Sequence, residues 1–231
     1  MNEPKQFFDT ISSTYTYLLA DRLTRDAVLI DPVDEEADTY LQYLSNYDFK
    51  LRYILETHVH ADHITAAEKL RQATGAQTAA PAGCGVPTAD LALLDGEVLK
   101  FGAETVKVLH TPGHTPGHVA YLWRDCAFTG DALLIGGCGR TDFQGGDAGM
   151  LYDAITGRLF ALPDETRMFP GHDYRGNKAS TIGDEKRSNP RLAGKTREEF
   201  IDIMANLKLA PPKMIDIAVP ANKRSGLRHE A

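Results

Sequence analysis

Short apolar runs alternate with amphipathic stretches along the first third of the chain. The runs at 14–19, 27–30 and 51–57 are rich in β-forming residues and predict strands. Apolar residues recur over 37–47 with the spacing of one helix face, and 65–73 has a similar pattern. Strands interleaved with helices indicate an α/β sandwich, although periodicity leaves the topology open.

The alternation continues through the rest of the chain. We expect two strands joined at Gly102 over 97–110 and a hairpin over 119–129. A helix over 150–162, a short strand over 167–169 and a final amphipathic helix over 197–207 follow. No internal repeat is visible. We therefore expect a single domain over 1–231, with a short C-terminal helical extension and tail from about 190 to 231.

Composition narrows the classes of function. The 231 residues carry 25 Lys and Arg against 32 Asp and Glu, and no basic run stands out before the tail, so a nucleic-acid partner is not expected. The apolar runs are too short to span a membrane, and the N-terminus lacks the apolar core of a signal peptide. Three cysteines form no disulfide framework, which favours a cytoplasmic location.

The most informative stretch follows the expected strand at 51–57. It places His58, His60, Asp62 and His63 within six residues. Side chains alternate in extended chain, so His58 and His60 are expected to point the same way, and a turn can bring His63 round. Imidazole and carboxylate groups are ligands that suit zinc and iron, so this stretch predicts a metal site.

Three further ligand candidates lie downstream, each in a loop marked by glycine at the end of a strand. They are His114, Asp131 and His172. Glycine lets the backbone turn tightly and approach a metal. A lone histidine is more often structural, and we interpret His110 and His118 as structural or as supports for the ligands. A cluster followed by three matching loops is much rarer by chance.

These motifs, in this order, resemble the metallo-β-lactamase superfamily. The resemblance implies an αββα four-layer sandwich. A narrower resemblance, to the persulfide dioxygenases (also called sulfur dioxygenases), extends from about 7 to 226 and is carried by four segments, 129–144, 170–176, 189–192 and 215–222. One departure is Gly136, where that family often has Arg.

The narrower resemblance implies a ligand set and a cofactor. One Fe(II) per chain is expected on His58, His114 and Asp131, the two histidines and one carboxylate of a facial triad with open positions. Four other positions bind metal in the two-metal hydrolase relatives, and here they are expected to surround and orient these ligands instead. They are His60, Asp62, His63 and His172.

The resemblance also implies a reaction. An iron-dependent dioxygenase of this kind oxidises glutathione persulfide with O2 and water to sulfite and glutathione. Because glutathione carries two carboxylates, we expect cationic and hydroxyl contacts from Arg140, Tyr174 and Arg224. Its relatives imply a homodimer.

Two alternatives stay open. A hydrolase of the glyoxalase II type, which cleaves acyl-glutathione thioesters, would use all the ligand types present here. Against it, His63 is followed by Ile64 and Thr65 where those enzymes tend to have glycine. A metal or sulfane-sulfur sensor that binds without turnover is the second alternative, although no DNA-binding element is recognisable.

Overall fold

The computed structural model describes residues 3–228, and its chain divides into two compact units. Among these described residues, unit 1 is formed from 3–93, Leu99–Thr105 and 211–228, and unit 2 from Leu94–Val98 and Val106–Ala210. The expected single domain over 1–231 stays a prediction. The C-terminal segment contributes to both units, since its helix Arg197–Ala205 belongs to unit 2 and its helix Ile215–Asn222 to unit 1.

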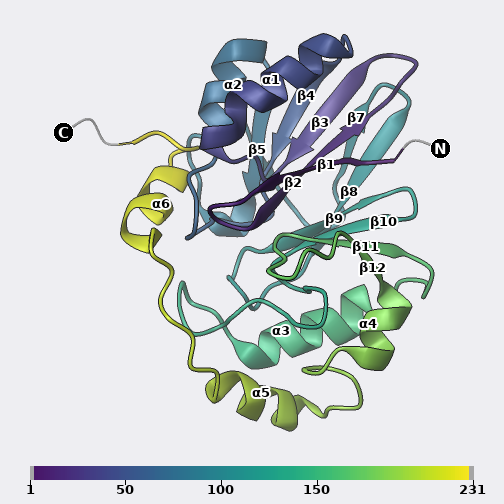
Figure 1. Ribbon diagram of the computed structural model, residues 1–231, viewed down its shortest axis with the longest axis vertical. Coiled ribbons are helices and arrows are strands. Elements are labelled where there is room, and N and C mark those ends of the chain that lie inside the picture. The colour runs from purple at the N-terminus through teal and green to yellow at the C-terminus, as the bar shows by residue number, and fades with distance from the viewer. Residues whose placement is uncertain (1–2, 229–231) are drawn as a thin grey trace. The chain divides into compact units, whose positions relative to one another are not determined.

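Unit 1 is built on a six-stranded sheet (Figure 1). Its strands lie in sequence order, β1 (Lys5–Asp9), β2 (Thr14–Ala20), β3 (Asp26–Ile30), β4 (Lys50–Leu55), β5 (Gln77–Pro81) and β6 (Leu91–Leu93). The first three pair antiparallel, and β3 to β6 pair parallel. The carboxyl ends of β3 and β4 therefore meet at one edge, where the histidine-rich segment begins.

Two helices cover one face of this sheet, α1 (Ala37–Asn46) and α2 (Ala67–Thr74) (Figure 1). Tyr40, Leu44 and Leu70 are buried in one cluster with Leu29 and Ile54 of the strands. Burial of such side chains provides most of the stability of a layer of this kind. Short 3-10 turns at Asp34–Glu36 and Ala82–Cys84 complete the connections.

Unit 2 contains most of a second six-stranded sheet, with the order β12-β11-β10-β9-β8-β7. Its strands are β7 (Val98–Phe101), β8 (Glu104–His110), β9 (Val119–Trp123), β10 (Cys126–Gly130), β11 (Arg167–Pro170) and β12 (Ser180–Thr181). Three helices belong to this unit, α3 (Ala148–Ala154), which continues as a π-helical turn over Ile155–Leu159, α4 (Ile182–Ser188) and α5 (Arg197–Ala205). Leu151, Ile155 and Phe200 pack with Met168 in its core.

The expected elements are present, with additions. The two strands joined at Gly102, the hairpin and the helix at 197–207 correspond to β7 to β10 and α5. The pattern did not predict helix α6 (Ile215–Asn222), which contains Pro220. This helix forms because Ala218 and Ala221 pack on Ile64, a contact between distant parts of the chain. Within 3–228, no helix is long and apolar enough to cross a membrane.

Candidate metal centre

The segment after β4 begins with a chain of hydrogen bonds that orients His58. Thr57 donates its N–H to Asp31 Oδ1 over 2.7 Å and its hydroxyl to Asp31 Oδ2 over 2.8 Å. Because that hydroxyl proton is used, the 2.9 Å contact between Thr57 Oγ1 and His58 Nδ1 places the donor on the imidazole. Nδ1 then carries the proton, and Nε2 carries the lone pair that a metal needs.

His60 lies beside two carboxylates. Its Nε2 is 3.1 Å from Asp31 Oδ1 and 3.4 Å from Glu56 Oε2, and the ring is buried. Burial alone would lower the pKa of His60, but the charges of Asp31 and Glu56 raise it well above its ordinary value. Burial raises the pKa of Glu56, whose other oxygen accepts from the Thr65 hydroxyl. Among the described residues neither ring nitrogen of His60 has a hydrogen-bond partner of good geometry, so these contacts are electrostatic.

Asp62 and His63 form a separate pair on the same segment. His63 Nδ1 lies 2.9 Å from Asp62 Oδ2, and the hydroxyl of Thr14 donates to that oxygen over 3.1 Å. Thr14 is buried on β2, so the pair is tied to the antiparallel part of the sheet. In unit 1, the four candidates of this segment therefore have different neighbours, although their sequence spacing made them look equivalent.

In unit 2, Asp131 lies between two histidines. Its Oδ2 is 3.6 Å from His114 Nε2 and its Oδ1 is 3.5 Å from His172 Nε2. Asp131 and His172 follow β10 and β11, which are parallel neighbours, and so they meet at one sheet edge. The buried Asp131 Oδ1 has no hydrogen-bond partner among the described residues. A buried carboxylate oxygen left in this way is suited to a cation.

A main-chain carbonyl orients His114. The Nδ1 of His114 is 2.7 Å from the carbonyl oxygen of Arg140. A carbonyl only accepts, so Nδ1 carries the proton, and the lone pair of the ring is on Nε2, the atom that faces Asp131. Both His58 and His114 thus present the nitrogen that suits a metal.

Close packing around Gly139 fixes the loop that carries the carbonyl of Arg140. A Cβ on Gly139 would lie 2.2 Å from the carbonyl oxygen of Asp131 and 2.9 Å from His114 Nδ1. The N–H of Gly139 donates to the same Asp131 oxygen over 2.7 Å. Only glycine fits between the two candidate ligands.

His118 supports Asp131, in agreement with the structural role expected of it. The main-chain N–H of Asp131 donates to His118 Nε2 over 3.0 Å, and His118 Nδ1 is 2.9 Å from the hydroxyl of Thr111. The ring is fully buried. Sequence reasoning missed Asp31 and Thr57, and the signal that could have found them is their place at the carboxyl ends of the expected strands 27–30 and 51–57.

The three residues expected to contact the substrate lie in different surroundings. Arg140 forms a bidentate ion pair with Asp142, at 2.6 and 2.5 Å, and donates to the carbonyl of Ala210 over 2.6 Å. Its partner Asp142 raises the pKa of Arg140. Tyr174 is 74% exposed, and its ring lies parallel to that of His172, with the ring centroids 6.1 Å apart. Arg224, in unit 1, is half-buried just beyond α6.

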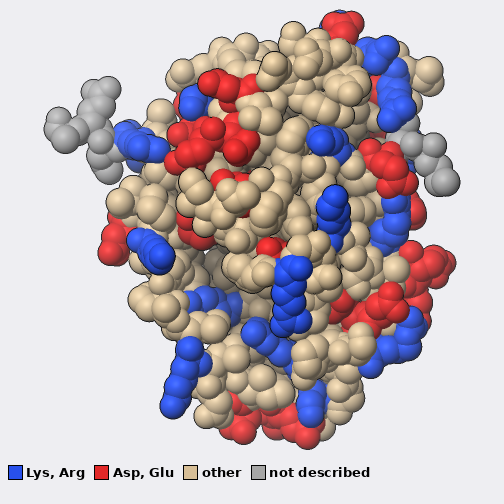
Figure 2. Space-filling view, viewed as in Figure 1, with Lys and Arg blue, Asp and Glu red and all other residues tan. Residues whose placement is uncertain are grey.

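Charges of both signs are interspersed on the face drawn in Figure 2. Blue and red side chains both occur across this face.

Comparison with known proteins identifies the family. The model of the metallo-β-lactamase superfamily matches residues 9–172. The human mitochondrial persulfide dioxygenase ETHE1 is 46% identical over 227 residues, which are 97% of this chain and 89% of the relative. The chain belongs to the persulfide dioxygenases of the metallo-β-lactamase superfamily. This confirms the family and the α/β fold class predicted from the motifs.

A solved structure agrees with this assignment. The crystal structure of ETHE1 from Myxococcus xanthus is 52% identical, with a TM-score of 0.95, over 97% of this chain and 100% of that one. The hydroxyacylglutathione hydrolase GloC of Haemophilus influenzae is less similar, at 37% identity over 74% of this chain and 90% of the relative. The chain thus has a metal-binding fold that carries candidate His and Asp ligands.

Proposed function

We propose that this protein is an iron-dependent persulfide dioxygenase that oxidises glutathione persulfide with O2 and water to sulfite and glutathione. The observation that carries the proposal is the near full-length similarity to persulfide dioxygenases, at 46% and 52% identity. We also propose a homodimer, which the resemblance implies, and a cytoplasmic location, which the sparse cysteines favour.

We propose that His58, His114 and Asp131 hold one Fe(II) per chain. Two observations support this donor set. Each histidine donates its Nδ1 proton to a neighbouring oxygen and so keeps a lone pair on Nε2, and Asp131 has a buried oxygen with no hydrogen-bond partner among the described residues. Two imidazoles and one carboxylate suit iron and leave positions open for reactants.

The bound iron would supply the redox chemistry that joins spin-paired sulfur to triplet oxygen. The residues of the chain orient its ligands. Thr57 and the carbonyl of Arg140 fix the rotation and tautomer of the two imidazoles, and His118 holds the backbone of Asp131. His60, Asp62, His63 and His172 are proposed to surround the iron without binding it.

For the substrate, we propose contacts from Arg140, Tyr174 and Arg224. The exposed ring of Tyr174 offers a hydroxyl beside His172. The guanidinium of Arg140 is already paired with Asp142, so a substrate carboxylate would have to share or displace that partner. Arg140 therefore has two separable roles to test, one through its side chain and one through its carbonyl.

Metal analysis combined with oxygen uptake tests the proposal. The purified protein should contain about one iron per chain and should consume O2 when given glutathione persulfide. Two tightly held zinc ions together with thioesterase activity would refute it in favour of the glyoxalase II type of hydrolase. Stoichiometric metal or sulfur binding without turnover would favour a sensor.

A further inference from the structure

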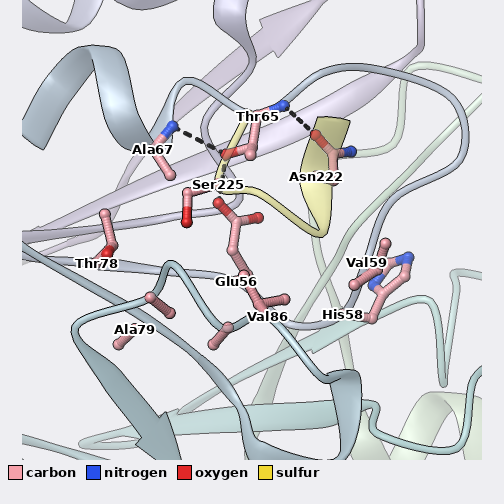
Figure 3. Close-up of a pocket in the computed structure, with 12 residues that line it drawn as sticks. Glu56, His58, Val59, Thr65, Ala67, Thr78, Ala79, Val86, Asn222 and Ser225 are labelled. Atoms are coloured by element: carbon pink, nitrogen blue, oxygen red, sulfur yellow. Dashed lines mark hydrogen bonds between the residues drawn. The ribbon is translucent and has the colours of Figure 1, made fainter. Parts of the chain in front are cut away.

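The side chain of Asn222, at the end of α6, is buried against the histidine-rich segment of unit 1 (Figure 3). Its Oδ1 accepts from the N–H of Thr65 over 2.9 Å. Its Nδ2 donates to the carbonyl of His60 over 3.0 Å and to the carbonyl of His63 over 2.8 Å. Both amide protons are thus used, and the two carbonyls and one N–H admit only one orientation of the amide.

These three partners lie within six consecutive residues that form no helix or regular strand. Buried polar backbone groups in such a segment need partners from elsewhere. The β3–α1 connection provides some of them, since Asp34 donates its N–H to the carbonyl of Ile64 over 2.8 Å. Asn222 provides three more, from a position 157 residues beyond Thr65.

The segment after α6 is fastened to unit 1 by separate contacts. The carbonyl of Ser225 accepts from the N–H of Glu68 over 3.0 Å, and its hydroxyl is 2.8 Å from the hydroxyl of Thr88. A Cβ on Gly226 would lie 2.2 Å from the carbonyl oxygen of Thr65. Attachment of the tail therefore does not depend on Asn222 alone. A substitution of Asn222 can thus test its hydrogen bonds to the histidine-rich segment separately from attachment of the tail.

We propose that Asn222 is a positioning residue for the metal centre: its side-chain amide holds the backbone of His60–Thr65 and thereby the position of His58. The inference rests on the proposed function only in naming the metal that is held. Side chains that orient ligands from outside the coordination sphere typically change metal affinity about 10- to 100-fold when they are removed. Asn222 does not contact a proposed ligand side chain and acts instead through the backbone of the segment that carries His58.

Asn222→Asp separates hydrogen bonding from packing. The substitution keeps the volume and the acceptor for Thr65, but it replaces the donor with an oxygen that faces two carbonyl oxygens. Ser225→Ala is the matched control. Ser225 is equally buried in the same segment and also loses a hydrogen bond, but its hydroxyl contacts Thr88 and not the histidine-rich segment.

Three measurements test the inference on full-length protein. They are the rate of iron loss to a chelator at a temperature where every variant is folded, the visible spectrum of the cobalt-substituted protein, and hydrogen exchange of peptides covering 58–66 in metal-free protein. We expect Asn222→Asp to lose iron about tenfold faster, to change the cobalt spectrum and to exchange faster over 58–66. Ser225→Ala should match the wild type in all three.

Asn222→Ala should behave like Asn222→Asp, since it also removes both donated bonds. Iron loss and exchange in Asn222→Asp that equal those of Ser225→Ala would overturn the inference. A wild-type protein that holds no iron would refute the proposed function instead. In that case faster exchange over 58–66 would still support the positioning role, and unchanged exchange would still overturn it.

Discussion

The two regions that carry the proposed ligands hold their histidines in different ways. In unit 1, the ring of His58 is oriented by a side-chain relay, in which Thr57 links it to the carboxylate of Asp31. In unit 2, the ring of His114 is oriented directly by the main-chain carbonyl of Arg140. The electronic result is the same, a proton on Nδ1 and a lone pair on Nε2.

The two arrangements differ in the kind of substitution that can disrupt them. A hydroxyl or carboxylate is removed by one substitution with little change to the backbone. A carbonyl belongs to every residue, so its position is lost only when the path of the chain changes. We therefore expect unit 1 to be sensitive at the side chains of its relay, and unit 2 to be sensitive at Gly139, which sets the path of its loop.

The largest effect is expected from removing the ligands themselves. His58→Ala, His114→Ala and Asp131→Ala should each abolish iron retention and turnover, because a facial triad has no spare protein ligand. His172→Ala should retain measurable iron, although its Nε2 is 3.5 Å from Asp131. Iron content by elemental analysis decides this, and equal loss in all four variants would favour a binuclear site.

Gly139→Ala should have the next largest effect, by moving the loop of unit 2. The new Cβ would lie 2.2 Å from a backbone oxygen that cannot yield without shifting Asp131. Overpacking of this kind costs about 1–3 kcal/mol of unfolding free energy, and most of the iron should be lost. Gly137→Ala is the control, since its Cβ would meet only Arg191 at 3.9 Å. Denaturant unfolding and iron content that are equal in the two variants would argue against the constraint.

Thr57→Val tests the relay of unit 1 at almost constant shape. Without the hydroxyl, His58 loses the acceptor that selects its tautomer, and iron affinity should fall about 10- to 100-fold. Thr111→Val removes the equivalent hydroxyl beside His118, which contacts the backbone of Asp131 and not a proposed ligand ring. Its effect should be smaller. Competition with a chelator measures both, and the reverse order would show that the relay does not orient His58.

Arg140→Lys should have the smallest effect, because it leaves the carbonyl of residue 140 in place. The loss of the planar fork should raise KM for glutathione persulfide about tenfold, or about 1.4 kcal/mol, with iron content intact. Oxygen uptake and iron are measured on the same sample. An unchanged KM would remove the side chain from substrate binding. Loss of iron would instead show that its pairing with Asp142 supports the loop.

Much of the fold could be predicted from periodicity, and the family from motifs. The apolar runs at 14–19, 27–30 and 51–57 became β2, β3 and β4, since alternating or continuous apolar residues favour half-buried and buried strands. Helix α6 could not be predicted this way. It contains Pro220, and it is stabilised by packing of Ala218 and Ala221 on Ile64, which no local pattern records.

For the candidate site, too, the sequence predicts one part and only the tertiary structure decides the other. The kinds of ligand and their order, from His58 to His172, can be read along the chain because each chemically distinctive side chain follows a strand or a glycine. What holds them could not be read there. Asp31 reaches Thr57 across neighbouring parallel strands, Arg140 reaches His114 with a carbonyl that all residues share, and Asn222 reaches Thr65 from the far end of the chain. Hydrogen bonds depend on distance and direction in space, and folding alone brings these partners within 3 Å of one another.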